Sequence, residues 1–341
     1  MAVTIRDVAA AAGVSQSTVS RALSAPDLVN ARTRARVERA ARELGYEPNR
    51  AARGLITGRT GNLGLIVPDL ANPLFAAVVK GVQAAARAAD HSVFIADTDE
   101  DADAEPGLLR ALSKQVDGIV LCSPRTPDEG LAGAGGDPPV VLMNRRVRGY
   151  PSVTVDNADG MRQALEHLAA LGHRRVAYVA GPRSSWSNGQ REQGLRATAD
   201  ALGVDLVHLG HFPPRFDGGV AAADLAVASG STAVVAYNDI VALGLLSRLG
   251  ARGIPVPDRI SVLGCDDIPM SAMTHPALTT VAVPQHEAGR AAVAMLLALL
   301  AEPDGDAGPG EPNRDLPTQL VVRATTGVAP DPAPRTADRS R

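Results

Sequence analysis

The sequence has few of the residues that metal and redox sites require. Its two cysteines, Cys122 and Cys265, are far apart, which excludes both the CxxC motif and the usual spacing of zinc ligands. The histidines form no HExxH motif, and neither GxSxG nor GxxxxGK[ST] occurs. The segment Gly133–Asp137 is a weak phosphate cradle, and no glycine-rich dinucleotide fingerprint joins a strand to a helix. We therefore expect no metal and no cofactor, and the sequence points away from an enzyme.

Long apolar runs are also absent. The run Ala291–Ala301 is too short to span a bilayer. The first residues are typical of a capped polar helix, not of a basic stretch that leads into an apolar segment. We therefore expect no signal peptide, no membrane partner and a cytoplasmic protein.

Lysine is scarce, and the positive charge is unevenly distributed. Residues 1–60 contain ten Arg, no Lys and five acidic residues, a net charge of +5, whereas the whole chain carries −3. The remaining residues therefore carry −8. A basic N-terminal part on an acidic body is the pattern expected when that part alone contacts phosphates.

The first 23 residues predict two short helices around a tight turn. Thr4 and Asp7 make a start like a capping box, with Asp in place of Glu or Gln. Gly13 can supply a left-handed turn, and Ser15 is a good N-cap for the second helix. The outer face of that helix is polar and holds Gln16, Ser17, Thr18, Ser20 and Arg21. Such side chains hydrogen-bond to base edges and phosphates, so the pattern is typical of a helix-turn-helix unit.

A third helix is expected from about Asn30 to Leu44, ending at Gly45. Its predicted buried stripe consists of Val37, Ala40, Ala41 and Leu44. Its other face is strongly basic and holds Arg32, Arg34, Arg36, Arg39 and Arg42. The alternative is a three-helix domain with a solvated charged face. We favour the DNA-reading interpretation because turn, caps, stripe and charge agree.

From residue 61 onward, short apolar runs alternate with helical stretches. The expected strands are Leu63–Val67, Ser92–Ala96, Gly118–Leu121, Val140–Met143, Arg175–Ala180, Leu206–Leu209, Ala233–Ala236 and Ile260–Gly264. This alternation predicts parallel sheets with helices on both faces. The two similar halves, 61–157 and 158–283, predict duplicated lobes. Ligands of such sheets bind beyond the carboxyl ends of the strands.

Polar and aromatic side chains follow these predicted strands. They are Asp69, Asn72, Phe75, Cys122, Ser123, Asn144 and Arg145 in the first half, and Ser185, Trp186, Arg191, Asn238, Asp239, Asp266 and Asp267 in the second. Carboxylates, amides and guanidinium groups beside aromatic rings suit a polyhydroxylated ligand. A nucleoside suits the same set, with Trp186 as the stacking surface.

Structural interpretations remain open for three of these residues. Asn238 with Asp239 could N-cap a helix at Ile240–Arg252. Asp266 could be a turn former, and Arg191 could form an ion pair between the lobes. The sequence alone does not separate these roles from ligand contact.

Several stretches together resemble one family. They are TIRDVAAAAGVSQSTVSRAL, ARELGYEPNRAARGL, LGLIVPDLANPLF, HLAALGHRRVAYVAGP, AYNDIVALGLL, ISVLGCDDI, HPALTTV and LPTQLVVRATTG. They occur in the order found in the lactose-repressor (LacI/GalR) family of bacterial transcription regulators, and they cover about residues 4–327. The chain therefore resembles this family over nearly its whole length.

The resemblance implies roles in DNA binding. Gln16, Ser17 and Arg21 would read base edges, and the full set of expected contacts is Thr4, Ser15, Gln16, Ser17, Thr18, Ser20, Arg21, Asn49, Ala52 and Leu55. Residues 49–56 would form a hinge helix whose Leu55 opens the centre of the operator from the minor groove. An eight-residue helix that contains Gly54 is too short to be stable alone, so it should fold only on DNA beside its twofold mate.

For the body, the resemblance implies a fold like that of periplasmic sugar-binding proteins. The candidate effector contacts are Phe75, Ser123, Asn144, Trp186, Arg191, Asn238 and Asp266. The expected domains are a helix-turn-helix domain (1–48), a hinge helix and linker (49–60), an N-terminal lobe (61–157 and about 284–316), a C-terminal lobe (158–283 and about 317–327) and a disordered tail (328–341). Cys265 departs from the family, in which an aromatic residue commonly precedes the paired Asp, so no specific sugar follows.

The sequence thus predicts a transcriptional repressor that binds a palindromic operator as a homodimer. A sugar, sugar phosphate or nucleoside between two doubly wound parallel-sheet lobes would control it, by induction or by co-repression. The tail lacks the heptad pattern of a coiled coil, which favours a dimer over a tetramer. One alternative is a solute-binding protein of a transport system, disfavoured by the basic head and the missing export signal. The other is a Rossmann-like enzyme, for which Asp266 with Asp267 is the candidate acid/base pair.

Overall fold

The computed structural model describes residues 3–24, 26–46, 59–131, 138–301 and 313–331. The chain separates into two units, Met1–Gly61 and Asn62–Arg341, which we call the head and the body and treat separately. Among the described residues, no helix has both the length and the apolar character needed to cross a membrane.

The described head consists of helices around one small core. They are α1 (Ile5–Ala12), α2 (Gln16–Ser24), the 3-10 turn η1 (Pro26–Leu28) and α3 (Ala31–Leu44). At the start of α1, the Thr4 backbone N–H and hydroxyl both donate to the Asp7 carboxylate, at 2.8 and 2.7 Å. These hydrogen bonds lower the pKa of Asp7. Gly13 ends α1 with a φ of 60°, which is the left-handed conformation expected at the turn.

Three valines, Val8, Val19 and Val37, form the centre of the head core and are fully buried. One prediction for this core is wrong. Leu44 was expected in the buried stripe of α3, but 38% of its surface is exposed. It is the last residue of α3, and Tyr46, two positions later, packs against the core.

The body contains two six-stranded sheets with strands of duplicated order. The first sheet has the order β11-β5-β4-β3-β1-β2, and the second β12-β10-β9-β8-β6-β7. The first comprises β1 (Asn62–Val67), β2 (Ser92–Asp97), β3 (Gly118–Cys122), β4 (Val140–Met143), β5 (Ser152–Val155) and β11 (Asn313–Leu316), and the second β6 (Arg175–Ala180), β7 (Asp205–His211), β8 (Ala233–Ala236), β9 (Ser261–Asp266), β10 (Thr279–Ala282) and β12 (Gln319–Val321). All described pairings are parallel except that of β12 with β10.

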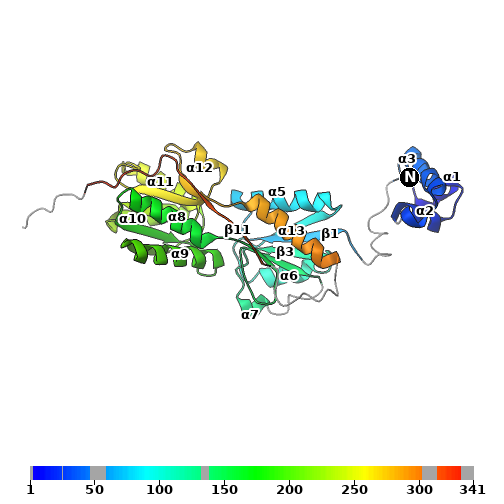
Figure 1. The fold of residues 1–341 in the computed structure, drawn as a ribbon, viewed down its shortest axis with the longest axis horizontal. Helices are drawn as coiled ribbons and strands as arrows, with labels where there is room; N and C mark the ends of the chain where they lie inside the picture. Colours follow the sequence, from blue (N-terminus) through cyan, green and yellow to red (C-terminus); the bar gives the residue numbers. More distant parts are fainter. Residues whose placement is uncertain (1–2, 25, 47–58, 132–137, 302–312, 332–341) are drawn as a thin grey trace, which may run out of the picture. The chain divides into compact units, whose positions relative to one another are not determined.

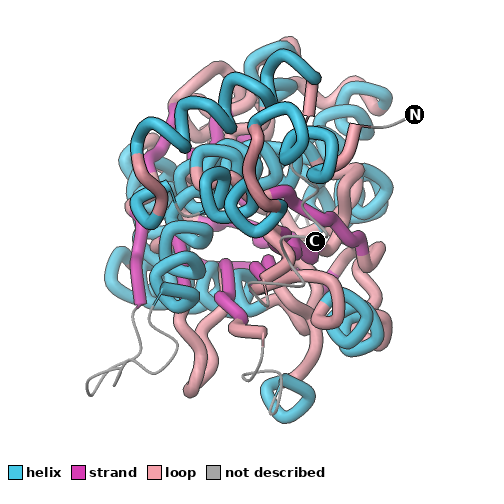
Figure 2. Tube along the Cα trace, turned by 90° about the vertical axis from the view of Figure 1, so that its right-hand side faces the viewer, coloured by secondary structure: helices cyan, strands magenta, loops and turns pink. Residues whose placement is uncertain are grey.

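In Figure 2 the strands lie among helices. The first lobe carries α5 (Pro73–Ala88), α6 (Glu105–Leu112), α7 (Asp128–Leu131) and α13 (Gln285–Ala301), and the second α8 (Asn157–Ala170), α9 (Trp186–Leu202), α10 (Phe216–Ala228), α11 (Asp239–Ala251) and α12 (Pro269–Met273). Helix α13 follows the second lobe in the sequence but lies along α5 of the first (Figure 1). The two helices approach closely at Gly81, which has no side chain. A Cβ at this position would lie only 2.1 Å from the His286 carbonyl oxygen.

The chain crosses between the lobes three times. The crossings follow β5, β10 and β11, and each is only a few residues long. Two of them are hydrogen-bonded to each other, because the Asp156 N–H donates to the Leu316 carbonyl at 2.9 Å and the Thr318 hydroxyl donates to the Asp156 carbonyl at 3.0 Å. The lobes are therefore joined by neighbouring strand-like connections.

Candidate functional site

A polar cavity lies between the two lobes, where the carboxyl ends of the parallel strands of both sheets meet. The first lobe contributes Phe75, Glu100, Ser123, Arg125 and Asn144, and the second contributes Arg191, Tyr237, Asn238 and Asp266. The space left for water centres is about 20 Å³, enough for about one water. The lobes therefore leave little space between them at these residues.

Backbone strain is concentrated around this cavity. Ser123, Asn144 and Asp266 all line it, and their φ angles are 47°, 51° and 126°. Residues other than glycine rarely adopt such angles, and they persist where the surrounding structure holds them for a function. The strain therefore marks the same strand ends that the sequence singled out.

The wall of the second lobe is built on Arg191 and Asp266. Arg191 lies on α9 and is buried, and its Nε donates to the Asn157 Oδ1 at 2.9 Å. Its Nη1 donates to the Tyr237 carbonyl, and its guanidinium lies 5.0 Å from the centre of the Tyr237 ring. Its bond to Asp266 Oδ1 is long, at 3.4 Å. The interpretation of Arg191 as an ion pair between the lobes is wrong, because Asp266 belongs to the same lobe.

The carboxyl group of Asp266 is buried, and its neighbours offset the cost of burying its negative charge only weakly. Burial raises its pKa to about 8, against the opposing effect of the Arg191 charge, and the nearby charge of Asp239 raises it further. Among the described residues, the donors that lower this pKa are Arg191, at 3.4 Å, and the Cys265 thiol, which is a weak donor. Ligand hydroxyls would supply further donors to the Asp266 carboxylate.

Asn238 and Asp239, at the N-terminal end of α11, support this wall. Asn238 N-caps the helix, accepting from the Val241 N–H at 2.8 Å, which confirms the capping interpretation. Its side chain also lines the cavity. Asp239 is fully buried and accepts from the Ile268 N–H at 3.0 Å and the Ser271 hydroxyl at 2.6 Å. These bonds fix the chain that follows Asp266.

The wall of the first lobe includes two amides with an unused oxygen. Asn144 donates from Nδ2 to the Ser123 hydroxyl at 3.2 Å. Among the described residues, neither Asn144 Oδ1 nor Gln285 Oε1 has a hydrogen-bond partner, although both atoms are buried. Both residues line the cavity, where Phe75 adds a buried aromatic ring. Gln285 was not predicted, because it begins a helix rather than following a predicted strand.

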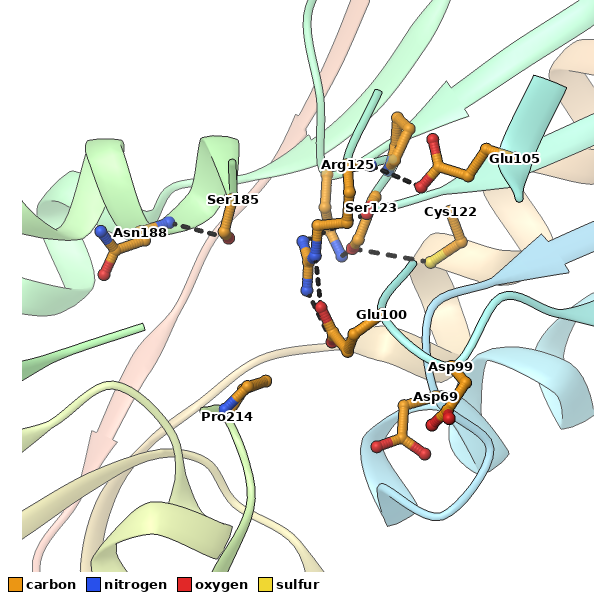
Figure 3. A network of polar contacts seen from close by, with 12 residues as sticks. Asp69, Asp99, Glu100, Glu105, Cys122, Ser123, Arg125, Ser185, Asn188 and Pro214 are labelled. Carbon is orange, nitrogen blue, oxygen red and sulfur yellow. Dashed lines mark hydrogen bonds and ion pairs between the residues drawn. The ribbon is translucent and has the colours of Figure 1, made fainter. Parts of the chain in front are cut away.

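An ion pair in the first lobe was also not predicted. Arg125 donates to the Glu100 carboxylate from Nε at 2.6 Å and from Nη2 at 2.9 Å, and its side chain is only 3% exposed (Figure 3). Glu105 fixes the same loop, because its carboxylate accepts from the Arg125 backbone N–H at 2.6 Å. Arg125 lies three residues beyond β3, so a wider search of the strand-end loops could have found it.

Trp186 lies elsewhere. It is half-buried as the first residue of α9 and is not among the described residues that line the cavity. Its neighbour Ser185 caps α9, accepting from the Asn188 N–H at 3.2 Å, and contacts the Tyr237 hydroxyl at 3.0 Å. The described site therefore brings together six of the seven candidate effector residues.

The head presents its candidate DNA-reading residues on the surface. Thr4, Ser15, Gln16, Ser17 and Arg21 are exposed, while Thr18 and Ser20 are half-buried. The Ser15 hydroxyl accepts from the Thr18 N–H at 3.2 Å at the start of α2. The positions expected in the hinge helix, Asn49, Ala52 and Leu55, lie outside the described residues.

An exposed polar helix after a left-handed glycine turn, together with a two-lobed body around a polar cavity, defines a ligand-responsive DNA-binding regulator. The family model for "Bacterial regulatory proteins, lacI family" matches residues 4–49, and the model for a "Periplasmic binding protein-like domain" matches residues 165–326. The transcriptional repressor CytR of Escherichia coli (strain K12) is 33% identical over 337 residues, covering 96% of this chain and 98% of CytR. The chain belongs to the LacI family of bacterial transcription regulators.

Solved structures agree with this assignment. The lac repressor dimer bound to operator and the anti-inducer ONPF matches with a TM-score of 0.83 and 30% identity, covering 96% of this chain and 100% of the repressor chain. The transcriptional regulator CelR in complex with cellobiose matches with a TM-score of 0.69 and 32% identity, covering 95% of this chain and 99% of the CelR chain. The two-lobe fold and the helix-turn-helix head predicted from the sequence are confirmed.

Proposed function

We propose that this protein is a repressor that binds a twofold-symmetric operator as a homodimer and that a neutral, hydroxyl-rich small molecule controls it from the cavity between the lobes. The observation that carries the proposal is the weakly compensated Asp266 carboxyl beside Arg191, in a cavity also lined by two amides whose buried oxygens lack a partner among the described residues. The related CytR is a repressor, and the related CelR structure holds cellobiose. We infer a regulator rather than an enzyme, in the cytoplasm, from these relatives.

The charges of the cavity favour a neutral effector. Four charged side chains line it, and they form the pairs Arg125–Glu100 and Arg191–Asp266. Each cationic side chain lining the described cavity therefore has an acidic partner, and only the partner of Arg191 is distant, at 3.4 Å. The unused groups are oxygen acceptors, which hydroxyl groups can satisfy. This chemistry favours a sugar over a sugar phosphate.

The aromatic surfaces of the cavity favour a sugar over a nucleoside. One face of the Tyr237 ring is covered by Arg191, and a Cβ at Gly181 would lie 2.5 Å from the ring. Tyr237 therefore has little free face for stacking on a base. Phe75 remains as the aromatic partner among the described lining residues, and one ring suffices to cover the apolar face of a sugar.

Effector binding must be coupled to lobe movement. The space left at the lining residues is about 20 Å³, too small for a sugar, so we expect the lobes to part when a sugar binds among these residues. A ligand that favours one lobe arrangement shifts the population toward it, and this shift is how the body would control the head.

A thermal-shift panel tests the effector class. The purified full chain would be melted with ribose, glucose, cellobiose and cytidine, and with the phosphate esters of the two monosaccharides as matched controls. Binding to the folded form alone raises the melting temperature. We expect a shift with a neutral sugar and none with its phosphate. A shift with a phosphate ester alone, or with cytidine alone, would contradict the proposed class.

A gel-shift series tests the DNA side. The chain should form a saturable complex with a palindrome from its own upstream region, and the complex should weaken steeply with salt. Arg21→Ala should reduce operator affinity by about tenfold to a hundredfold, because a good base contact contributes about 1–3 kcal/mol. Its melting temperature should stay unchanged, since Arg21 is exposed. Leu55→Ala should weaken operator binding as well, and leave effector binding intact.

Dimer formation has a candidate surface in the body. Strand β2 is an edge strand of the first sheet, and its side chains Phe94 and Ile95 are 39% and 37% exposed. An exposed apolar edge strand invites pairing with another chain. We therefore place the homodimer contact at β2. Phe94→Lys should shift the protein toward monomer in sedimentation, whereas an unchanged dimer would move the interface elsewhere.

A further inference from the structure

Arg215 joins the two lobes beside the cavity. It precedes α10 in the second lobe, and its Nε donates to Asp69 Oδ2 of the first lobe at 3.3 Å. Its Nη2 donates to Asp99 of the first lobe. The sequence neighbours Pro214 and Glu100 both line the cavity, so these ion pairs lie at its edge. Of the ion pairs found among the described residues, only those of Arg215 cross between the lobes.

The second lobe holds Arg215 on a fixed segment. The Pro214 carbonyl accepts from Asn238 Nδ2 at 3.0 Å, and the Arg215 carbonyl accepts from the Gly218 N–H at 3.1 Å. A Cβ at Gly218 would lie 2.1 Å from the Pro213 carbonyl oxygen, so the turn packs tightly on the start of α10. The segment that carries Arg215 is therefore fixed to the second lobe, and its guanidinium moves with that lobe.

Hydrogen bonds in the first lobe hold Asp69 through its carboxylate and Asp99 through its backbone. Asp69 Oδ1 accepts from the Ala71 N–H at 2.8 Å, and Asp97 Oδ1 accepts from the Asp99 N–H at 2.9 Å. Asp99 and Glu100 have consecutive φ angles of 51° and 62°. Glu100 keeps this strained turn in place through its paired bonds to buried Arg125, and Figure 3 shows Asp69 and Asp99 side by side below it. The Asp69 carboxylate and the backbone of Asp99 are therefore held in place independently of Arg215.

We propose that Arg215 is an electrostatic latch that holds the two lobes closed over the cavity by binding Asp69 and Asp99 together. Opening the cleft would withdraw the one cation and leave the two carboxylates facing each other. The proposal rests on the proposed function in taking this cavity as the effector site, because the latch then sets how readily the site opens and closes.

The ion pairs of Arg215 favour the closed arrangement of the lobes only modestly, and salt changes their strength. The side chains of Arg215 and Asp99 are 45% and 83% exposed, so water and salt screen their attraction. Asp69 is 9% exposed and is screened less. Closure should therefore weaken as ionic strength rises, and a contact of this size can be overcome by a ligand.

Distances between spin labels on the two lobes test the latch without any effector. The labels go to Ala88→Cys at the end of α5 and Leu202→Cys at the end of α9, which are both exposed, whereas the native cysteines are buried. Labelled chain is diluted with unlabelled chain so that distances within one chain dominate. Arg215→Gln is compared with Arg252→Gln, a matched control whose side chain is 44% exposed and pairs with Asp224 of its own lobe at 2.5 Å.

At about 0.1 M salt, Arg215→Gln should lower the closed population several-fold and lengthen the distance between the labels. The parent chain should show the same change when salt is raised to about 1 M, where the Debye length falls to about 3 Å. Arg252→Gln should match the parent at both salt concentrations. Asp99→Asn should repeat the effect of Arg215→Gln, and the double variant should add little to either.

Unchanged distances in both Arg215→Gln and Asp99→Asn at low salt would overturn the latch. The outcome is separable from the effector proposal. If no sugar, phosphate ester or nucleoside shifts the melting temperature but the label distance responds to Arg215→Gln, the effector assignment fails and the latch stands. If a sugar binds and the distance ignores Arg215, the latch fails alone.

Discussion

The two walls of the cavity each carry one buried arginine and one acidic partner, yet they differ in how well these charges are matched. In the first lobe, Arg125 and Glu100 share two hydrogen bonds of 2.6 and 2.9 Å. In the second lobe, Arg191 reaches Asp266 only at 3.4 Å and divides its other donors between Asn157 and Tyr237. The two hydrogen bonds of the first pair match its charges well, whereas the charges of the second pair can still bind a further hydrogen-bonding partner.

The difference separates a scaffold from a recognition group. A complete, fork-shaped pair gains little from a ligand and loses much if one member is removed. A long, buried pair can gain by accepting hydroxyl donors in the low-dielectric site. Position in a cavity is therefore a weaker guide to ligand contact than the hydrogen bonds that a side chain still lacks.

The strongest test of this contrast is Asp266→Asn. It removes the charge that would accept from two hydroxyls, and hydrogen bonds to charged groups contribute about 1.5–3 kcal/mol each. Above about pH 8, where the carboxylate is ionised, we expect effector affinity to fall by about a hundredfold or more, measured by titration calorimetry with the sugar found in the thermal-shift panel. Operator binding without effector should persist. Affinity within twofold of the parent would remove Asp266 from recognition.

Glu100→Gln should affect the two quantities in the opposite way, with a large loss of stability and a small loss of effector affinity. Breaking a buried ion pair by removing one member costs about 3–5 kcal/mol, and the 15% exposure of the Glu100 side chain places the expected loss at the lower end. The free energy of unfolding should fall by about 3 kcal/mol in urea titrations, while effector affinity falls less than tenfold. A large loss of effector affinity at unchanged stability would show that Glu100 contacts the effector. The two ion pairs would then not differ in role.

The pH dependence of stability and of effector affinity should arise from the wall of the second lobe alone. Because the pKa of Asp266 is raised to about 8, the folded chain holds a proton that the unfolded chain releases near pH 4. This contribution to stability is full at low pH and is lost as pH rises through about 8, while effector affinity rises from about pH 7 to 9 as the carboxylate ionises. Asp266→Asn should flatten both profiles, measured by urea titration and calorimetry across this range. An equally steep profile in the variant would assign the pH dependence to another group.

The smallest expected effect is that of Gln285→Met. This near-isosteric change removes the buried oxygen that lacks a partner among the described residues. An unsatisfied buried group costs about 1–3 kcal/mol, so the effector-free chain should be stabilised by about 1 kcal/mol. Effector affinity should fall by about tenfold, because one acceptor is lost. Stability and affinity that change in the same direction would show that Gln285 has a partner in solution.

Much of the fold follows from local sequence patterns. The turn at Gly13, the cap at Ser15 and the alternating strands and helices are short-range signals, and each expected strand is present. Strands β5, β10, β11 and β12 were not predicted. Each has only three or four residues, and β11 reads Asn-Arg-Asp-Leu, so pairing with β5 rather than its own pattern makes it a strand.

The site was predictable only in part, for a physical reason. Strand ends gather in a doubly wound sheet, so Arg191, Asn238 and Asp266 could be placed together from the sequence. Gln285 and Arg215 could not, because each reaches its position through a contact between distant segments. Trp186 shows the converse: a rare aromatic residue after a predicted strand begins α9 beside the lining residue Ser187, yet is not itself among the described residues that line the cavity.

The triple connection between the lobes limits the kind of motion that a ligand can produce. With two of the three crossings hydrogen-bonded to each other through Asp156, twisting or sliding of one lobe would shear these bonds, whereas bending across the strands leaves them intact. Bending of the connections is therefore the motion that these hydrogen bonds oppose least, and we expect an effector to act through it.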